Sequence, residues 1–288
     1  GGTPTCQRLG ETPLTAKYLQ KQDQVVNHRA CPMIEFVKVS GEQIAVKTLG
    51  VLDGRPTIVM LHEGLGSITQ WRDLPDSIHA LTGLTVLLYD RSGYGRSSAN
   101  NSQYEPDFMH LEASETLPAL LKQLNISKPI LFGHSDGGTI SLIAASSPMV
   151  SPAAVVTIAA HIFVESAVIE GVQSAVARRN LIVDGMSRHH SDPETTFDRW
   201  AKIWLDPRFA TFDIRNLLSK ITCPLLALQG DRDEYATEEM VHGVTREVPH
   251  ATGTFIPECG HIAHRDQPKF LVEQFVKFLD ENQLNGST

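Results

Sequence analysis

The feature that most constrains the fold is a regular alternation between short apolar segments and segments with helical periodicity. Most of the apolar segments lack polar alternation, which is typical of strands buried on both faces of a sheet. The segments between them repeat apolar residues every three or four positions. This alternation predicts an α/β domain in which helices flank both faces of a mostly parallel sheet. The predicted strands are residues 57–64, 84–90, 129–133, 153–160, 224–230 and 253–258, and the predicted helices are about 68–81, 108–124, 139–145, 237–248 and 268–280.

Two further strands precede this series. Residues 34–41 and 42–50 alternate apolar and polar side chains, and Gly41 lies where the two segments meet. This pattern predicts an antiparallel hairpin. Together with the buried strands, the hairpin gives an eight-stranded sheet. We assign the core domain to residues 31–161 and 223–288.

The segment that separates these two parts of the core, residues 162–222, contains no strand candidate. It is too long for an ordinary loop, and residues 165–183 and 195–204 have helical patterns. We therefore expect a helical cap over one end of the sheet. The cap holds two of the three tryptophans, Trp200 and Trp204. Aromatic side chains serve equally well to line a substrate pocket or to form a small core within the cap.

Composition argues against two classes of partner. The chain of 288 residues has a formal charge of −8 and an isoelectric point near 5.8, and it contains no run of Lys or Arg. Because nucleic acids and anionic membrane surfaces attract basic proteins, neither is expected to bind. No apolar run approaches the ~20 residues that a membrane-spanning helix needs. A small molecule is the expected partner.

The cysteines and the first segment of the chain bear on location. Four scattered cysteines without metal-site spacing predict reduced thiols and a cytoplasmic protein, with a Cys6–Cys31 disulfide as the alternative. Residues 1–30 are polar and weakly patterned, which predicts an N-terminal arm. Residues 1–5 have neither the basic start nor the apolar centre of a signal peptide. The first residue is not Met, so the sequence leaves open a leader removed before this start.

Glycine, histidine and carboxylate residues gather directly after the predicted strands. Ligands of open parallel sheets bind beyond the carboxyl ends of the strands. The sequence therefore predicts an active site at this edge of the sheet. The stretches are residues 62–67 (HEGLGS), 90–98 (DRSGYGRSS), 133–138 (GHSDGG), His161, 230–236 (GDRDEYA) and 259–268 (CGHIAHRDQP).

The most informative of these stretches is Gly-His-Ser-Asp-Gly at residues 133–137, between an apolar strand and a helical segment. In that context a sharp turn can hold the Ser135 hydroxyl at the sheet edge, with backbone N–H groups facing the same space. The alternative is a glycine-rich connection that carries a solvated serine. Glycine suits both, because it has no Cβ to obstruct a tight turn.

Together these motifs resemble the α/β-hydrolase fold family over about residues 34–279. The resemblance implies that Ser135 is a nucleophile, that His261 takes its proton, and that Asp233 orients the imidazole. The order Ser, Asp, His agrees with the family. The resemblance also implies an oxyanion hole formed by the backbone N–H groups of Gly64 and Asp136.

Several of these roles have rivals. Glu63 stands where relatives commonly carry glycine, and its carboxylate either repels an oxyanion or is tied to Arg91, Arg96 or another cation. His134 is expected to be structural, because the turn directs the side chains beside Ser135 elsewhere, and Cys259 is expected to be a packed thiol and not a second nucleophile. The rivals for the acid are Asp231, Glu234 and Glu165, and the rival for the base is His264.

The leading hypothesis is a serine hydrolase that cleaves a small carboxylic ester or lactone through an acyl-enzyme on Ser135. Glu63, His161, Trp200 and Trp204 are expected to line its pocket. No metal, nucleotide or flavin motif is evident, so no metal ion and no cofactor are expected. The alternatives keep the triad but cleave a C–C or amide bond, or keep the scaffold as a non-catalytic ligand receptor.

Overall fold

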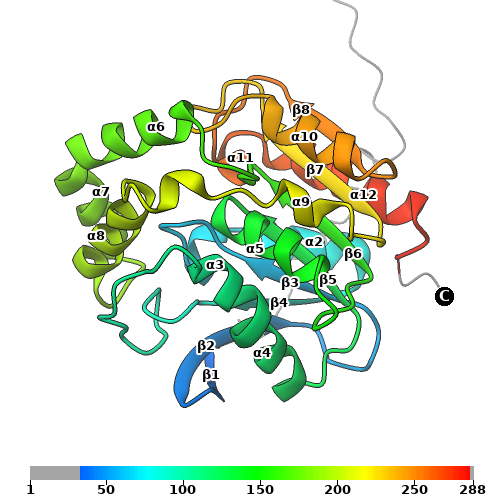
Figure 1. Ribbon diagram of the computed structural model, residues 1–288. Coiled ribbons are helices and arrows are strands. Elements are labelled where there is room, and N and C mark those ends of the chain that lie inside the picture. Colours follow the sequence, from blue (N-terminus) through cyan, green and yellow to red (C-terminus); the bar gives the residue numbers. More distant parts are fainter. Residues whose placement is uncertain (1–32, 286–288) are drawn as a thin grey trace, which may run out of the picture.

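The computed structural model describes residues 33–285, which form one sheet of eight strands with helices on both faces (Figure 1). The strands lie in the order β1-β2-β4-β3-β5-β6-β7-β8. β2 alone runs antiparallel to the other strands, so the predicted α/β fold with a mostly parallel eight-stranded sheet is confirmed. The strands are β1 (Glu35–Val39), β2 (Glu42–Leu49), β3 (Thr57–Leu61), β4 (Thr85–Tyr89), β5 (Pro129–His134), β6 (Ala154–Ile158), β7 (Leu225–Gly230) and β8 (Thr252–Ile256).

Burial explains the apolar character of the central strands. Every residue of β3 to β7 is buried, because helices cover both faces of this part of the sheet. The edge strand β8 is only partly buried and is less apolar. At the other edge, β1 and β2 form the predicted hairpin, and Gly41 has a φ of +93° in its turn. Glycine adopts that left-handed conformation without steric cost.

Two layers of helices enclose the sheet. The first layer packs on one core cluster that includes Trp71 and Phe275, and the second layer packs on the other cluster together with the segment between β6 and β7. The first layer is α2 (Leu74–Thr82) and α12 (Pro268–Glu281), and the second is α3 (Phe108–Leu111), α4 (Leu117–Gln123), α5 (Asp136–Ala145) and α10 (Glu239–Glu247).

Proline changes two of the predicted helices. Residues 68–81 form a 3₁₀ turn at Ile68–Trp71, and α2 then starts with Pro75 in its first turn. The predicted helix 108–124 is helical throughout, but residues Glu112–Thr116 form a π-turn between α3 and α4. Pro118 has no N–H to donate to the preceding turn, which accounts for the break in the regular α-helical ladder there.

The segment between β6 and β7 is helical, as expected. Its helices α6, α7 and α8 pack against one another beside one end of the sheet (left in Figure 1). The shorter α9 instead packs on α5 and α10, within the second layer. The division into a core and a cap at residues 162–222 remains our prediction. The elements are α6 (Ser166–Ala177), α7 (Arg179–Met186), α8 (Pro193–Trp204), a 3₁₀ turn (Phe209–Thr211) and α9 (Arg215–Leu218).

Two further expectations concern the ends and the surface of the chain. The predicted arm at residues 1–30 and the Cys6–Cys31 alternative lie outside the described residues. Within residues 33–285, no helix is both long and apolar enough to cross a membrane.

Candidate active site

Ser135 occupies a sharp turn between β5 and α5. Its φ of +51° and ψ of −118° are unusual for a residue with a side chain and are typical of strained functional turns. The turn also requires its two glycines. A Cβ on Gly133 would lie 2.2 Å from the carbonyl oxygen of Gly137, and a Cβ on Gly137 would lie 2.1 Å from that of Leu61. The motif therefore holds the Ser135 side chain at the carboxyl edge of the sheet.

His261 is hydrogen-bonded to Asp233. The imidazole Nδ1 lies 2.9 Å from Oδ1 and 3.0 Å from Oδ2 of the carboxylate, which is completely buried. Asp233 Oδ1 also accepts the backbone N–H of Tyr235 at 2.9 Å, so two donors fix its orientation. Burial disfavours the imidazolium, but the Asp233 carboxylate outweighs burial and raises the pKa of His261. Burial likewise opposes ionisation of Asp233, yet His261 keeps the pKa of that carboxyl below its usual value.

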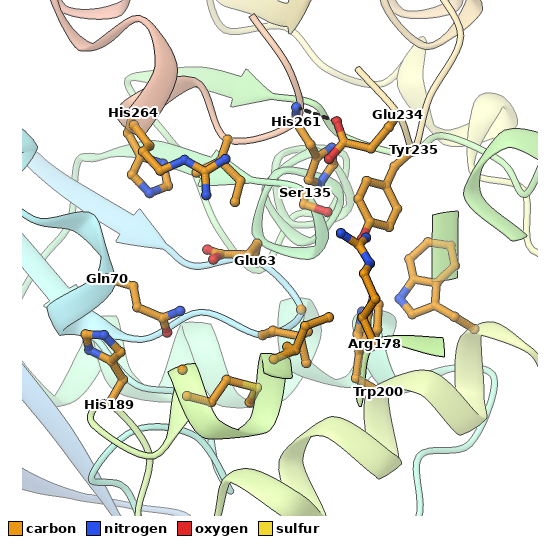
Figure 2. Close-up of a pocket in the computed structure, with 18 of the residues that line it drawn as sticks. Glu63, Gln70, Ser135, Arg178, His189, Trp200, Glu234, Tyr235, His261 and His264 are labelled. Carbon is orange, nitrogen blue, oxygen red and sulfur yellow. Dashed lines mark hydrogen bonds between the residues drawn. The ribbon is translucent and has the colours of Figure 1, made fainter. Parts of the chain in front are cut away.

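Ser135 and His261 line the same cavity (Figure 2). In the described part of the chain, no hydrogen bond joins the Ser135 hydroxyl to the imidazole. Such hydrogen bonds are often long or misaligned without substrate and tighten when it binds.

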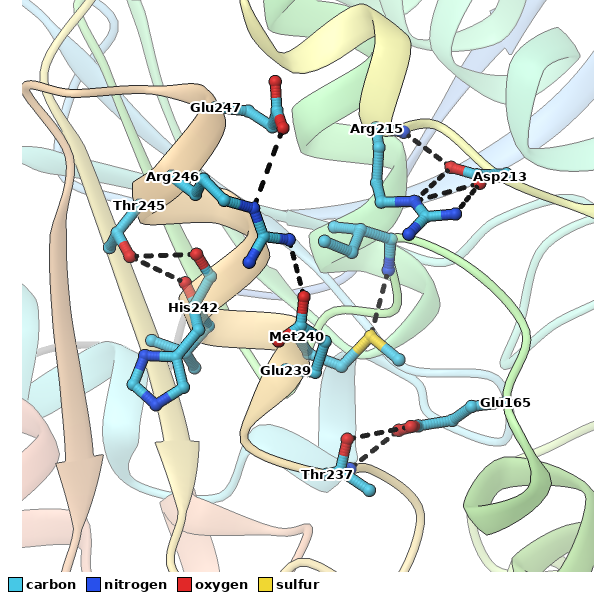
Figure 3. A network of polar contacts seen from close by, with 12 residues as sticks. Glu165, Asp213, Arg215, Thr237, Glu239, Met240, His242, Thr245, Arg246 and Glu247 are labelled. Carbon is cyan, nitrogen blue, oxygen red and sulfur yellow. Dashed lines mark hydrogen bonds and ion pairs between the residues drawn. The ribbon is translucent and has the colours of Figure 1, made fainter.

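The three rival acids have other partners. Asp231 accepts the backbone N–H of Cys259 at 3.1 Å, and Glu234 accepts the backbone N–H of His261 at 3.1 Å. Glu165 binds the backbone N–H and the hydroxyl of Thr237 at 2.7 and 2.8 Å (Figure 3). Among the four carboxylates, Asp233 is therefore the one that contacts the His261 ring.

The loop after β3 is held in place through the backbone carbonyl of Glu63. The carbonyl oxygen of Glu63 accepts the Gly66 N–H at 3.1 Å, the Arg91 guanidinium at 3.0 Å and the His62 Nδ1–H at 2.7 Å. The next residue, Gly64, adjoins the turn at Ser135, because a Cβ on Gly64 would lie 3.2 Å from Oδ2 of Asp136.

Asp136 is the first residue of α5. Its N–H is therefore one of the four at a helix start that have no carbonyl acceptor in the helix. Burial raises the pKa of its carboxyl group, although the Arg91 guanidinium lies only 3.5 Å away. Gly64 thus lies near Asp136, the residue that follows the serine, and an oxyanion hole formed by their N–H groups remains a prediction.

The Glu63 carboxylate is paired with a histidine. Its Oε2 lies 3.3 Å from His134 Nδ1, and His134 Nε2 donates to the backbone carbonyl of His261 at 2.8 Å. Burial opposes ionisation, but His134 outweighs it and keeps the pKa of Glu63 well below its usual range. Of the sequence alternatives, neither Arg91 nor Arg96 binds this carboxylate, and His134 takes that place. His134 also supports the loop that carries His261.

The cavity above Ser135 has a volume of about 470 Å³. His161 contributes a buried ring that stacks on the His261 ring at 6.0 Å, and burial lowers its pKa to about 3. His161 is consequently neutral at physiological pH. Glu63, Trp200 and Trp204 line the same cavity, as does the rival base His264.

Sequence reasoning missed much of the remaining wall. Arg178 lies between α6 and α7, Met186 is the last residue of α7, Gln70 lies in the 3₁₀ turn after β3, and Tyr235 lies two residues after Asp233. The position of Tyr235, two residues after the acid, was the one local signal. Cys259 is fully buried, and burial raises the pKa of its thiol to about 12, in keeping with a structural role.

Comparison with known proteins decides the family. A profile described as the alpha/beta hydrolase family matches residues 58–274. The chain belongs to the alpha/beta hydrolase family. It is 26% identical to the sn-1-specific diacylglycerol lipase ABHD11 of Mus musculus, over 80% of this chain and 83% of that protein. It is 25% identical to the serine hydrolase BPHL of Homo sapiens, over 84% and 85%.

A solved structure supports the fold. The crystal structure of a membrane phospholipase A aligns with a TM-score of 0.73 at 18% identity, over 93% of this chain and 92% of that one. Family membership makes hydrolysis the general class of reaction for this chain. Within residues 33–285, no group of three or more His, Cys, Asp or Glu side chains is arranged to hold a metal ion.

Proposed function

We propose that the protein is a serine hydrolase that cleaves a small carboxylic ester or lactone through an acyl-enzyme on Ser135. The observation that carries the proposal is that His261, hydrogen-bonded to the buried Asp233 carboxylate, lines one cavity with a serine on a strained turn. A serine hydroxyl is a poor nucleophile until a neighbouring base accepts its proton. The likeness to lipase ABHD11 and serine hydrolase BPHL supports the same chemistry.

In the first half-reaction, His261 Nε2 accepts the Ser135 proton while Oγ attacks the substrate carbonyl carbon. Asp233 holds the proton on Nδ1, so Nε2 keeps the lone pair that this step requires. The carbonyl electrons move to oxygen, and the N–H groups of Gly64 and Asp136 bind the oxyanion. When the tetrahedral intermediate collapses, the alkoxide leaves with the proton from His261. In a lactone, the alcohol stays tethered to the acyl group.

In the second half-reaction, water replaces the alcohol. His261 takes one proton from the water, and the resulting hydroxide attacks the acyl carbon. Collapse of this second intermediate releases the carboxylic acid and returns the proton to Ser135 Oγ. Each protonation step uses the same imidazole, which is neutral before the attack and positively charged in each intermediate.

The cavity suits a small substrate. Small-molecule pockets generally measure roughly 300–1,000 Å³, and this cavity of about 470 Å³ lies in the lower part of that range. Its wall combines aromatic rings with polar side chains, which matches an acyl compound that carries some polar groups.

Hydrolysis of p-nitrophenyl esters by purified protein tests the proposal. Ser135→Ala should abolish hydrolysis, whereas Ser146→Ala should not, because Ser146 lies at the far end of α5 and its hydroxyl binds the carbonyl of Ile143. Circular dichroism of both variants should match the wild type. Equal activity in wild type and Ser135→Ala would contradict the proposal.

A panel of substrates separates the bond types. Amides with matched acyl chains, and a diketone that tests C–C cleavage, should be hydrolysed less efficiently than esters. Lactones with matched acyl chains should be hydrolysed as efficiently as esters or less efficiently. A folded protein that binds these compounds but hydrolyses none of them would indicate a ligand receptor on the same scaffold.

A further inference from the structure

One wall of the Ser135 cavity carries two side chains, Arg178 and Tyr235, that each keep a hydrogen-bond donor without an acceptor among the described residues. Arg178 lies at the junction of α6 and α7, and Tyr235 lies in the loop after β7. Figure 2 shows the hydroxyl end of the Tyr235 ring next to the Arg178 guanidinium, on the side of the cavity where Ser135 lies. The two residues are far apart in sequence, and the fold brings them together on one wall of the cavity.

The guanidinium of Arg178 is held in place without being neutralised. Its Nε donates to the backbone carbonyl of Ser174 at 3.2 Å, and Nη2 donates to the Ser174 hydroxyl at 3.4 Å. Among the described residues, Nη1 has no acceptor and no carboxylate pairs with this guanidinium. These two contacts orient Arg178 and leave its positive charge available.

The neighbouring arginine behaves differently. Arg179 forms two hydrogen bonds of 2.7 Å to the carboxylate of Asp198, and it does not line the cavity. Such bidentate pairs satisfy the guanidinium. The two consecutive arginines therefore differ in their partners: a carboxylate pairs with the Arg179 guanidinium, and Arg178 faces the cavity with free donors.

Tyr235 is fixed from two sides. Its ring centroid lies 4.7 Å from that of His261, and α6 packs so closely that a Cβ on Gly171 would lie 2.5 Å from the ring. In the described part of the chain, the Tyr235 hydroxyl has no hydrogen-bond partner. Burial raises the pKa of that hydroxyl even though Arg178 lowers it, so the group is a protonated donor at neutral pH.

The acidic side chains of the cavity are engaged elsewhere. Glu63 is paired with His134, and Glu234 accepts the backbone N–H of His261. Neither neutralises Arg178. The chain as a whole carries a formal charge of −8, so an anion that enters this cavity needs a local cation to offset the general repulsion.

We propose that Arg178 and Tyr235 form a subsite for a carboxylate, so that the substrate is an ester or lactone that carries a second, free carboxylate. The inference rests on the proposed function, because it names the substrate class of the same site. A guanidinium N–H and a hydroxyl can each donate to one oxygen of a carboxylate, and charge-assisted hydrogen bonds of this kind are the strong ones. Because Tyr235 packs on His261, the carboxylate would lie only a few bonds from the reacting carbonyl.

Two p-nitrophenyl esters of equal acyl length test this inference. The hydrogen glutarate ester carries a free carboxylate, and the pentanoate ester is neutral. Wild-type protein should prefer the glutarate ester in kcat/KM. Arg178→Gln should lower that preference about 10- to 100-fold, the usual effect of losing a charged hydrogen bond. Arg178→Lys should restore part of it, and Tyr235→Phe should lower it less than Arg178→Gln.

Arg179→Gln is the matched control, because it removes the same charge one residue away and should keep the preference. Equal losses in Arg178→Gln and Arg179→Gln, or a wild-type preference for the pentanoate ester, would overturn the subsite. Titration calorimetry with glutarate on Ser135→Ala protein provides a readout without turnover. Binding that Arg178→Gln abolishes supports the subsite even if neither ester is hydrolysed, and undiminished binding in that variant refutes it.

Discussion

Replacing Asp233 by Asn should nearly abolish turnover and leave the fold intact. Asp233 accepts two N–H groups, from His261 Nδ1 and from the backbone of Tyr235, and its side chain is completely buried. An asparagine of almost the same shape can keep its carbonyl oxygen on the Tyr235 N–H. Its NH₂ group then faces His261 Nδ1, at the place where Oδ2 now lies 3.0 Å away.

This geometry reverses the tautomer of His261. An NH₂ donor favours a lone pair on Nδ1, so the ring proton moves to Nε2, and Nε2 can no longer accept the proton of Ser135. The equivalent change in a serine protease lowers kcat about 10⁴-fold, which corresponds to about 5 kcal/mol of transition-state stabilisation. We expect a loss of similar size here.

Steady-state hydrolysis of a p-nitrophenyl ester measures the effect, with thermal unfolding as the check on folding. Asp231→Asn is the matched control, because Asp231 binds the backbone N–H of Cys259 and does not contact the imidazole. Its kcat should stay near that of the wild type. If Asp233→Asn kept more than about a tenth of wild-type kcat, the tautomer argument would fail. Loss of activity in Asp231→Asn instead would show that Asp231 is the acid that orients His261.

Three further predictions follow from the same geometry. Activity should fall as pH decreases through the pKa of His261. The Asp233 carboxylate raises this pKa above its usual value against the effect of burial, so the midpoint of the kcat/KM profile should lie above about pH 6.5. A flat profile from pH 5 to 8 would contradict the base assignment. Glu63→Gln should move that midpoint to lower pH, because Glu63 is one of the carboxylates that raise the pKa of His261; an unchanged or higher midpoint would show that this charge is not felt at the base. Gly137→Ala should destabilise the protein by about 1–3 kcal/mol, since its Cβ would meet a backbone carbonyl at 2.1 Å. Gly185→Ala in α7, with open space around it, should stabilise by about 0.5–1 kcal/mol, and chemical denaturation that ranks the two glycine variants the other way would refute the packing argument.

The sheet and its serine turn could be predicted because their signals are local. A strand such as β5 is buried on both faces, so it is apolar from Pro129 to Phe132, and the glycines on either side of Ser135 are required by contacts closer than a Cβ allows. Because ligands of parallel sheets bind at the carboxyl ends of the strands, Asp233 and His261 could be predicted at the same edge. None of these inferences needs the orientation of a distant helix.

The rest of the cavity depends on that orientation. Arg178 and Met186 belong to the helical segment between β6 and β7, and helical periodicity predicts that such helices exist but not which side chain faces the serine. The sequence also did not reveal which side chain pairs with the Glu63 carboxylate. The sequence offered Arg91 and Arg96, but the Arg91 guanidinium binds the Glu63 carbonyl, and His134 at the end of β5 pairs with the carboxylate. A pairing across two strand ends is set by the register of the sheet.

Peptide mapping after treatment with a fluorophosphonate tests the central claim, that His261 activates Ser135 for nucleophilic attack. The account predicts a single phosphonylated residue, Ser135, and a labelling rate that falls as His261 becomes protonated and that collapses in His261→Ala. Labelling of another residue, or labelling of Ser135 at an unchanged rate without His261, would contradict it.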